Sequence, residues 1–262
     1  MGSIILLSVV LIAIFADFIA PYKYDDADLN MILQAPCAEY PFGTDDFGRD
    51  MLSRVIYGTR ITLQVAVVGV TIQLVLGIIV GLTSGYFGGA TDRILIFIAD
   101  LTWCIPGLIL ALAVVTVLGK GLNNSIIAIS IVSWAFYARS IRAKTMSLKN
   151  MPFVETGIAF GETSFSIIFR YIFPNIIPSV LVMATLNLPE TVMSTTALSF
   201  LGLGSQPPSP DWGLALSRGV KFISRAPWLS IFPGLALVYT VFGFSLFGEG
   251  LRDILDPRQK SK

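Results

Sequence analysis

The sequence predicts an all-α protein that crosses a membrane six times. Apolar residues make up 54% of the 262 residues, whereas Asp, Glu, Lys and Arg make up only 13%. An average soluble domain carries roughly a quarter of its residues as charged side chains. A net charge of +1 gives no basic field for nucleic acid, and the apolar content excludes a disordered chain. The lipid bilayer is therefore the expected surroundings, and no nucleic acid is expected as a partner.

The apolar residues gather in windows that approach the length of a membrane span, which is about 20 residues of helix for a hydrocarbon core of about 30 Å. The predicted spans are Ile4–Ala20, Ile61–Leu82, Ile94–Leu118, Ile126–Ala138, Asn175–Leu203 and Leu229–Phe247. The fourth window is short, but residues 139–148 can continue it as helix beyond the lipid. Three parts follow: a first span with its external loop (1–60), a core of five spans (61–253) and a short tail (254–262).

Lysine and arginine placement predicts that both termini are cytoplasmic. With that orientation, ten of the 18 basic residues fall on the inner side, and seven acidic residues lie in the outer stretch that follows the first span. The basic run Arg139–Lys149 beside the fourth span is the strongest single indication. The long inner loop is then 149–174, and residues 204–228 form a proline-rich outer loop.

Catalysis by this chain is not expected. The sequence contains no histidine and no GxxxxGK[ST] motif for nucleotide phosphates. Cys37 and Cys104 are far apart in the sequence and have no metal-ligand spacing, so no metal site and no disulfide are predicted. Without histidine, no hydroxyl has the usual base that activates a hydrolase nucleophile.

The inner loop is apolar where a simple linker would be polar. Val154, Ile158, Phe165, Ile168 and Phe169 recur at helical spacing. A cytoplasmic helix with an exposed apolar face requires a partner surface or lies on lipid, and composition alone does not separate the two.

The loop resembles the EAA loop of binding-protein-dependent ABC permeases, Glu-Ala-Ala-x3-Gly-x9-Ile-x-Leu-Pro. Glu155, Gly161 and Pro174 keep the register of that motif. The sequence departs from it where Thr156 and Gly157 replace the two alanines, and also at the last Ile and Leu positions, which hold Tyr171 and Phe173.

Further blocks along nearly the whole chain resemble C-type subunits of dipeptide, oligopeptide and nickel permeases. They are residues 42–54, 85–89, 197–204, 206–208, 233–236 and 250–257. Relatives usually carry a basic tail before the first span, whereas this chain enters apolar sequence at Ile4; a late start site or a shortened chain would account for that.

The resemblance implies a six-span permease of a type I ABC importer in a bacterial or archaeal cytoplasmic membrane. It implies a B-type permease partner, two ATP-binding subunits and an extracytoplasmic substrate-binding protein. ATP and Mg²⁺ would bind to the ATPase subunits, and this subunit would hold no cofactor. The expected cargo is a di- or oligopeptide, and nickel or a metal chelate is the alternative.

The resemblance also assigns roles to residues of the inner loop. Its short helix would sit in a groove of the ATPase and transmit the closure that ATP drives. The residues expected to make this coupling are Glu155, Thr156, Gly157, Gly161, Phe173 and Pro174. The alternative for Glu155 is a solvated acid at a helix N-terminus, which the helix dipole stabilises by a few tenths of a kcal/mol.

Ionisable and polar residues inside predicted spans are candidates for the transport pathway, because they are costly in lipid. These are Asp100, Asn187 and Glu190. Asp100 has an equal alternative as the partner of Arg93 or Arg139. Pro189 is expected to break the fifth span, and Glu190 would then meet the amine of a peptide or favour cationic cargo, or would face the outer leaflet or the partner chain.

The outer loop offers two readings. Gln206, Asp211, Trp212 and Arg218 suit docking of a binding protein, whereas an interfacial aromatic belt would account for Trp212 equally well. Two other classes of protein fit less well. A secondary transporter would need inverted repeats and an ion-coupling site, and a membrane enzyme would need catalytic residues.

Overall fold

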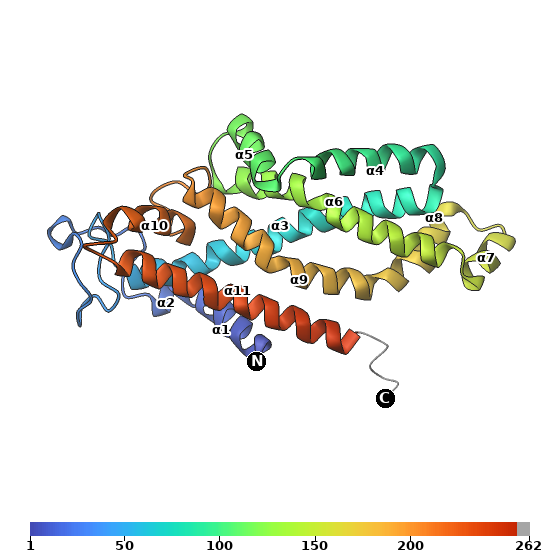
Figure 1. Ribbon diagram of the computed structural model, residues 1–262. Helices are drawn as coiled ribbons and strands as arrows, with labels where there is room; N and C mark the ends of the chain where they lie inside the picture. The colour runs from blue at the N-terminus through green and yellow to red at the C-terminus, as the bar shows by residue number, and fades with distance from the viewer. Residues whose placement is uncertain (256–262) are drawn as a thin grey trace.

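A computed structural model describes residues 1–255, which form an elongated bundle of helices (Figure 1). The elements are α1 (Gly2–Ile14), α2 (Ala16–Ile19), η1 (Leu29–Met31), α3 (Met51–Phe87), α4 (Gly89–Cys104), α5 (Gly107–Leu118), α6 (Leu122–Lys149), α7 (Pro152–Ala159), α8 (Ser164–Ser166), η2 (Ile167–Ile172), α9 (Phe173–Phe200), α10 (Trp212–Gly219), η3 (Val220–Phe222) and α11 (Trp228–Leu255). The all-α prediction is confirmed. The predicted tail 254–262 lies outside the described residues beyond Leu255.

Four helical segments of the described chain are long and apolar enough to cross a membrane: α3, α6, α11 and the continuous run Ser164–Phe200. The predicted third span is instead a pair of helices, α4 and α5, bent by 96°. Pro106 causes this bend, because a proline disfavours helical backbone in the residue before it. Ile105 accordingly adopts extended angles of φ −99° and ψ 132°.

The predicted first span also differs from expectation. It is divided at Phe15 into α1, of 13 residues, and α2, of four. At about 1.5 Å of rise per residue, α1 alone is shorter than a hydrocarbon core. α3 begins at Met51, where Asp50 caps it by accepting a hydrogen bond from the Ser53 amide. The expected boundary at residue 60 therefore falls inside a helix.

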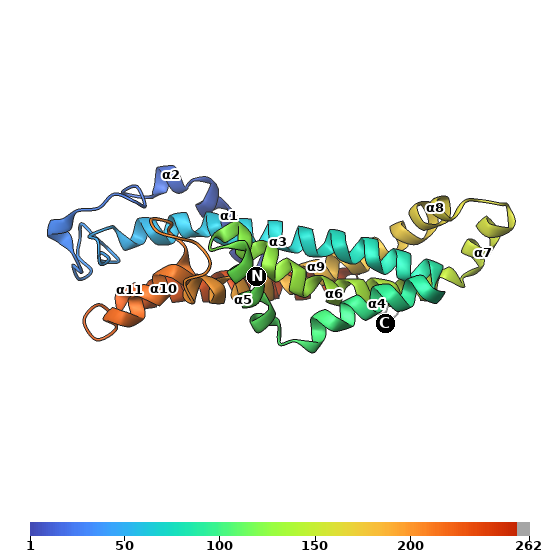
Figure 2. The same cartoon turned by 90° about the horizontal axis from the view of Figure 1, so that it is seen from above.

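The pairing of α3 with α6 forms the centre of the bundle. α9 packs on both of these helices and on α11, and α1 packs against α11 and α3. α4 runs alongside α3 and α6, and α5 crosses α6 (Figures 1 and 2). The continuation of the fourth span as helix through the basic run is confirmed, since α6 ends at Lys149.

A stripe of glycines brings α3 and α6 together. Gly77, Gly81 and Gly85 recur every fourth residue of α3, and a methyl group at any of them would lie within 2.7 Å of α6 side-chain atoms. The atoms in contact belong to Tyr137, Ile141 and Thr145, which also recur every fourth residue, on α6. Small residues at this spacing allow membrane helices to approach closely.

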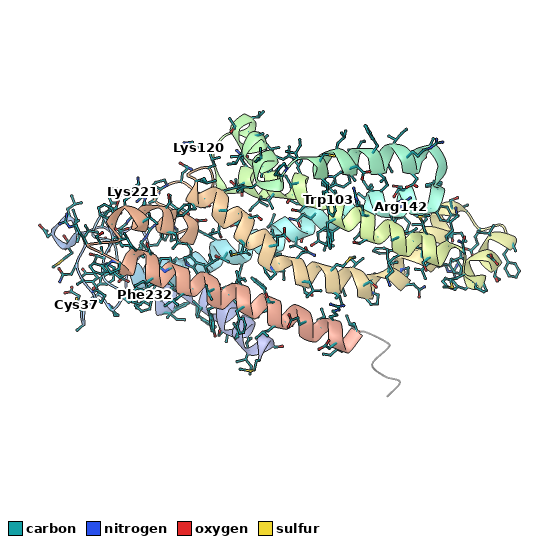
Figure 3. All side chains as sticks on the ribbon, viewed as in Figure 1. Cys37, Trp103, Lys120, Arg142, Lys221 and Phe232 are labelled. Atoms are coloured by element: carbon teal, nitrogen blue, oxygen red, sulfur yellow. The ribbon has the colours of Figure 1, made fainter. Side chains whose placement is uncertain are left out.

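The two ends of the bundle differ in character. The segment between α2 and α3 and the helix α10 gather at one end, whereas α7 and the turn between α3 and α4 lie at the other (Figure 1). These are the segments that the sequence assigns to opposite sides of the membrane. Cys37 and Lys221 mark the first end in Figure 3. Cys37 and Cys104 are both free.

Candidate coupling helix, transport cavity and docking end

α7 projects at the inner end of the bundle and is anchored there by two buried residues (Figure 2). The Val154 side chain is fully buried in a cluster with Ile167 and Ile172. Gly157 lies so close to Ile167 that an added methyl group would be 2.8 Å from its Cδ1 atom. One side of α7 is therefore fixed against the start of the following long helix.

The opposite side of α7 is apolar and exposed. Phe153 is 39% exposed, Ile158 49% and Phe160 83%. Phe165 and Phe169, which follow in the next helical turns, are 71% and 48% exposed. Helical spacing in the sequence also placed Val154 and Ile168 on the exposed apolar face, but both residues are buried within this chain. The surface available to a partner is this set of aromatic residues and Ile158, named here the inner apolar face.

The two polar positions of the expected coupling motif lie on α7. Glu155 is exposed in the first turn, where its negative charge interacts favourably with the helix dipole. The Thr156 hydroxyl donates to the Pro152 carbonyl at 2.8 Å. The Glu155 carboxylate has no ion-pair partner among the described residues.

Gly161 ends this part of the chain with a sharp turn. Its φ of +79° lies in the left-handed region that favours glycine, as the sequence predicts. The neighbouring Glu162 fixes the turn by accepting hydrogen bonds from the hydroxyls of Ser166 and Tyr171. The Ser166 bond, and then the Tyr171 bond, lower the pKa of the Glu162 carboxyl. Sequence reasoning missed Glu162, although it directly follows the motif glycine.

Phe173 and Pro174 lie within a continuous helix and do not restart the chain after a loop, which corrects the expected loop 149–174. The π-helix η2 runs directly into α9, and the Phe173 amide donates to the Ile168 carbonyl, five residues earlier. Pro174 has no N–H to donate to the preceding turn, and a local π-helical segment such as η2 is one way in which membrane helices tolerate a proline. Phe173 packs against the cluster that anchors α7. The long helix therefore connects α7 rigidly to the membrane-spanning part of α9.

Two of the three pathway candidates line one cavity. This cavity has a volume of about 370 Å³ and is bounded by α3, α6, α9 and the bend between α4 and α5. Asn187 and Glu190 contribute to its wall from α9. Trp103 contributes from the bend, and its side chain lies about midway along the bundle (Figure 3).

Asp100 does not line this cavity. Its carboxylate pairs with the Arg139 guanidinium, which also lies over the Trp103 ring at 4.6 Å from its centroid. The structure thus favours the ion-pair reading of Asp100 over a pathway role. A second ion pair joins α4 to α6, because both guanidinium nitrogens Nε and Nη2 of Arg142 donate to Asp92, at 2.5 and 2.6 Å.

The expected break at Pro189 is wrong, because α9 is helical through Phe200 with Pro178 and Pro189 inside it. Prolines occur within membrane helices where neighbouring groups compensate the lost backbone bond. Thr191 and Val192, two and three residues after Pro189, are buried against the rest of the bundle and hold the helix in place. Glu190 therefore projects from an intact helix.

The candidate docking residues fall into two groups. Gln206 is exposed and lines an outer hollow of about 660 Å³, and Arg218 is partly exposed, 3.7 Å from the Asp46 carboxylate. Asp211 and Trp212 are only 6% and 3% exposed, so their side chains do not reach a docking protein. Burial also excludes the aromatic-belt reading of Trp212, whose indole donates to the Val55 carbonyl at 3.1 Å.

Asp211 instead holds the outer loop together. It caps α10 by accepting from the Leu214 amide at 2.8 Å, and it accepts from the hydroxyls of Ser205 at 3.0 Å and Ser199 at 3.2 Å. Burial raises the pKa of its carboxyl, and these hydrogen bonds oppose the rise. The sequence signal was an Asp followed by a short amphipathic segment, which is an N-cap pattern.

This arrangement predicts that Asp211→Ala destabilises the protein more than Asp211→Asn. Loss of a helix cap costs about 1 kcal/mol, and alanine also leaves two buried hydroxyls without their acceptor, whereas asparagine retains an acceptor oxygen. Because the folded-state pKa is raised, the wild type binds its proton more tightly when folded. Its stability relative to Asp211→Asn should therefore fall as the pH rises from below 4. Thermal unfolding in detergent at several pH values measures both effects; equal stability of the two variants would contradict this role.

An ionic cluster that sequence reasoning did not interpret stabilises the outer end. Asp45 accepts from Arg49 Nε at 2.7 Å and lies 3.5 Å from Arg54 Nε. Arg54, which is 3% exposed, also donates to the carbonyls of Tyr24, Pro208 and Ser209. Residues 42–54 therefore have a structural role, because their ionic contacts and hydrogen bonds hold the outer segment, α3 and the proline-rich loop together.

The sequence matches the models of two protein families. Residues 73–261 match the binding-protein-dependent transport system inner membrane component, and residues 1–36 match the N-terminal TM domain of oligopeptide transport permease C. The chain belongs to this family of ABC importer permeases. It is accordingly a multi-pass protein of the cytoplasmic membrane, and the secondary-transporter alternative is set aside.

Curated relatives match over almost the whole chain. The dipeptide transport system permease protein DppC of Alkalihalophilus pseudofirmus is 43% identical over 260 residues, which cover 99% of this chain and 86% of that protein. The glutathione transport system permease protein GsiD of Pectobacterium atrosepticum is 37% identical over 261 residues, covering 99% and 87%.

Solved structures share the fold at low sequence identity. An inward-facing MetNI methionine ABC transporter chain aligns with a TM-score of 0.64 and 20% identity, covering 79% of this chain and 98% of that one. A chain of an amino acid ABC transporter solved with histidines aligns with a TM-score of 0.57 and 18% identity, covering 79% and 94%. These likenesses confirm the type I importer permease fold.

Proposed function

We propose that this chain is one of two permease subunits in an ATP-driven importer of short peptides. The observation that carries the proposal is the similarity of 99% of the chain to a dipeptide permease, at 43% identity. The similarity to a glutathione permease also fits a peptide-type cargo, since glutathione is a tripeptide. A B-type permease, two ATPase subunits and an extracytoplasmic binding protein complete the importer. ATP and Mg²⁺ are bound by the ATPase subunits.

The coupling step is a rigid-body movement of α7. Its inner apolar face is the surface that an ATPase groove would cover, because exposing several aromatic side chains of one short segment to water is unfavourable. Movement of α7 would be transmitted through Val154, Gly157 and the clustered isoleucines to α9. Since α9 also lines the central cavity, a shift at the inner end would change the width of that cavity.

The cargo is tested by transport in proteoliposomes that contain the complete complex and its binding protein. We expect ATP-dependent uptake of dialanine or trialanine and no uptake of a nickel–histidine chelate. Uptake of the chelate alone would replace the peptide assignment with the metal alternative and would leave the permease architecture unchanged. Absence of ATP dependence for every cargo would contradict the importer function itself.

Glu155→Ala is expected to reduce ATP-dependent uptake about tenfold while membrane insertion stays intact. The reason is that a charge-assisted hydrogen bond to a basic group of the ATPase contributes about 1.5–3 kcal/mol. The matched control is Glu39→Ala, which removes an exposed carboxylate in the outer segment. Normal uptake by Glu155→Ala, measured at equal complex content, would remove Glu155 from the coupling mechanism.

A further inference from the structure

The cavity of about 370 Å³ between α3, α6, α9 and the α4–α5 bend has the size of a ligand site. Among the residues that line it, Glu190 is the sole carboxylate, and no Lys or Arg contributes to the wall. None of the ion pairs in residues 1–255 involves Glu190. Arg139 of α6, which lies over the ring of the cavity residue Trp103, is paired with Asp100. The cavity therefore presents a negative charge without a counter-ion from this part of the chain.

A second observation in the same cavity points to a hydrogen-bonding ligand. Tyr137 lines the wall and is 1% exposed, yet its hydroxyl has no hydrogen-bond partner. A buried polar group without a partner costs about 1–3 kcal/mol. By contrast, Gln73 and Thr191 on the same wall bond to each other, with 3.3 Å between Nε2 and Oγ1. The wall thus holds one buried hydroxyl without a hydrogen-bond partner, that of Tyr137 on α6, and one exposed carboxylate without an ion pair among the described residues, that of Glu190 on α9.

The bend and α6 supply the remaining wall. Trp103 at the end of α4 and Phe136 on α6 contribute aromatic rings, and Pro106 lies in the bend between α4 and α5. Irregular backbone at membrane depth is tolerated where it lines a cavity that admits water. An aromatic ring face attracts a cation, and a carboxylate forms its strongest hydrogen bonds with a charged donor.

We infer that this cavity binds the primary ammonium group of the transported molecule, with Glu190 as its counter-ion and the Tyr137 hydroxyl as a further acceptor. An ammonium group carries three N–H donors, which suits a carboxylate and a hydroxyl on neighbouring helices. The inference rests on the proposed function for the identity of the cargo, because a short peptide carries such a group at its N-terminus. It adds a selecting site inside the permease itself, separate from selection by the binding protein.

The test is a binding measurement that does not depend on transport. Saturation-transfer difference NMR is recorded on the complete complex in nanodiscs, without ATP or binding protein, using trialanine and N-acetyltrialanine as probes. We expect trialanine to bind the wild type about tenfold more tightly than N-acetyltrialanine, since acetylation removes the charge and a charge-assisted bond. Glu190→Gln should abolish that difference. Glu249→Gln, the same change at an exposed carboxylate of α11 away from the cavity, should retain it.

Tyr137→Phe provides an independent variant, which removes one oxygen and keeps the ring. We expect it to weaken trialanine binding several-fold and to leave N-acetyltrialanine unchanged. Equal binding of the two probes by the wild type, or an unchanged preference in both Glu190→Gln and Tyr137→Phe, would overturn the inference. If peptides are still taken up with ATP, either of these results overturns only the inference, and the proposed function stands. If peptide uptake fails but the preference for the free ammonium group is intact, only the assignment of peptides as cargo is contradicted.

Discussion

Gly81→Leu is expected to lower the stability of the protein by about 3 kcal/mol, the upper part of the range typical of an overpacked core. The Cβ atom that it introduces would lie 2.7 Å from Ile141 Cβ and 2.8 Å from the Ala138 carbonyl oxygen. Neither atom is the end of a flexible side chain, so α3 and α6 must move apart. This separation would disrupt the central helix pair and the cavity that α3 and α6 help to bound.

The measurement is thermal unfolding of the purified chain in detergent, followed by the yield of assembled complex. Gly250→Leu is the matched control, because nothing lies within 4 Å of the Cβ position at Gly250, which is exposed near the end of α11. We expect the control to unfold as the wild type does. A Gly81→Leu protein as stable as this control would show that α3 and α6 are not packed as closely as described.

Phe160→Asp is expected to prevent stable association with the ATPase subunits. Phe160 is the most exposed residue of the inner apolar face, and a carboxylate at that position would have to be desolvated in an apolar groove. Substitution of a hot-spot residue in an interface costs at least about 2 kcal/mol of binding free energy, which corresponds to a loss of affinity of more than about tenfold.

Co-purification of the ATPase subunits with the permease measures this effect. The control is Ile223→Asp, because Ile223 is an exposed apolar residue at the outer end, 49% accessible. We expect the control to retain the ATPase subunits and Phe160→Asp to lose them. Equal retention by both variants would exclude the inner apolar face as the ATPase contact.

The sequence predicted the features that depend on local chemistry. Apolar windows indicated the long helices, and the motif glycine Gly161 indicated a turn that its positive φ confirms. The helical continuation of the fourth span through residues 139–148 was also predicted, and α6 extends to Lys149. Pattern and backbone preference are sufficient for such features, since they involve residues that are neighbours in the chain.

Features that depend on distant neighbours were not predicted. A proline has opposite consequences at two sites: Pro106 bends the chain by 96°, whereas Pro189 lies in a helix that packing holds together. Burial of Trp212 results from contact with α3, which the sequence of the outer loop does not reveal. The four-residue spacing of glycines in α3 was the available signal for the central helix pair, and only the structure shows which helix it contacts.

Transmission of ATPase closure to this permease through α7 underlies the proposed function. It is tested most directly by photo-crosslinking from a cysteine at position 158, introduced as Ile158→Cys into a chain with Cys37→Ser and Cys104→Ser and labelled with benzophenone maleimide. Ile158 is 49% exposed on the inner apolar face, and Ile223→Cys at the outer end serves as the matched position. We expect an adduct with an ATPase subunit from position 158 and none from position 223. No ATPase adduct from position 158, or equal adducts from both positions, would contradict it.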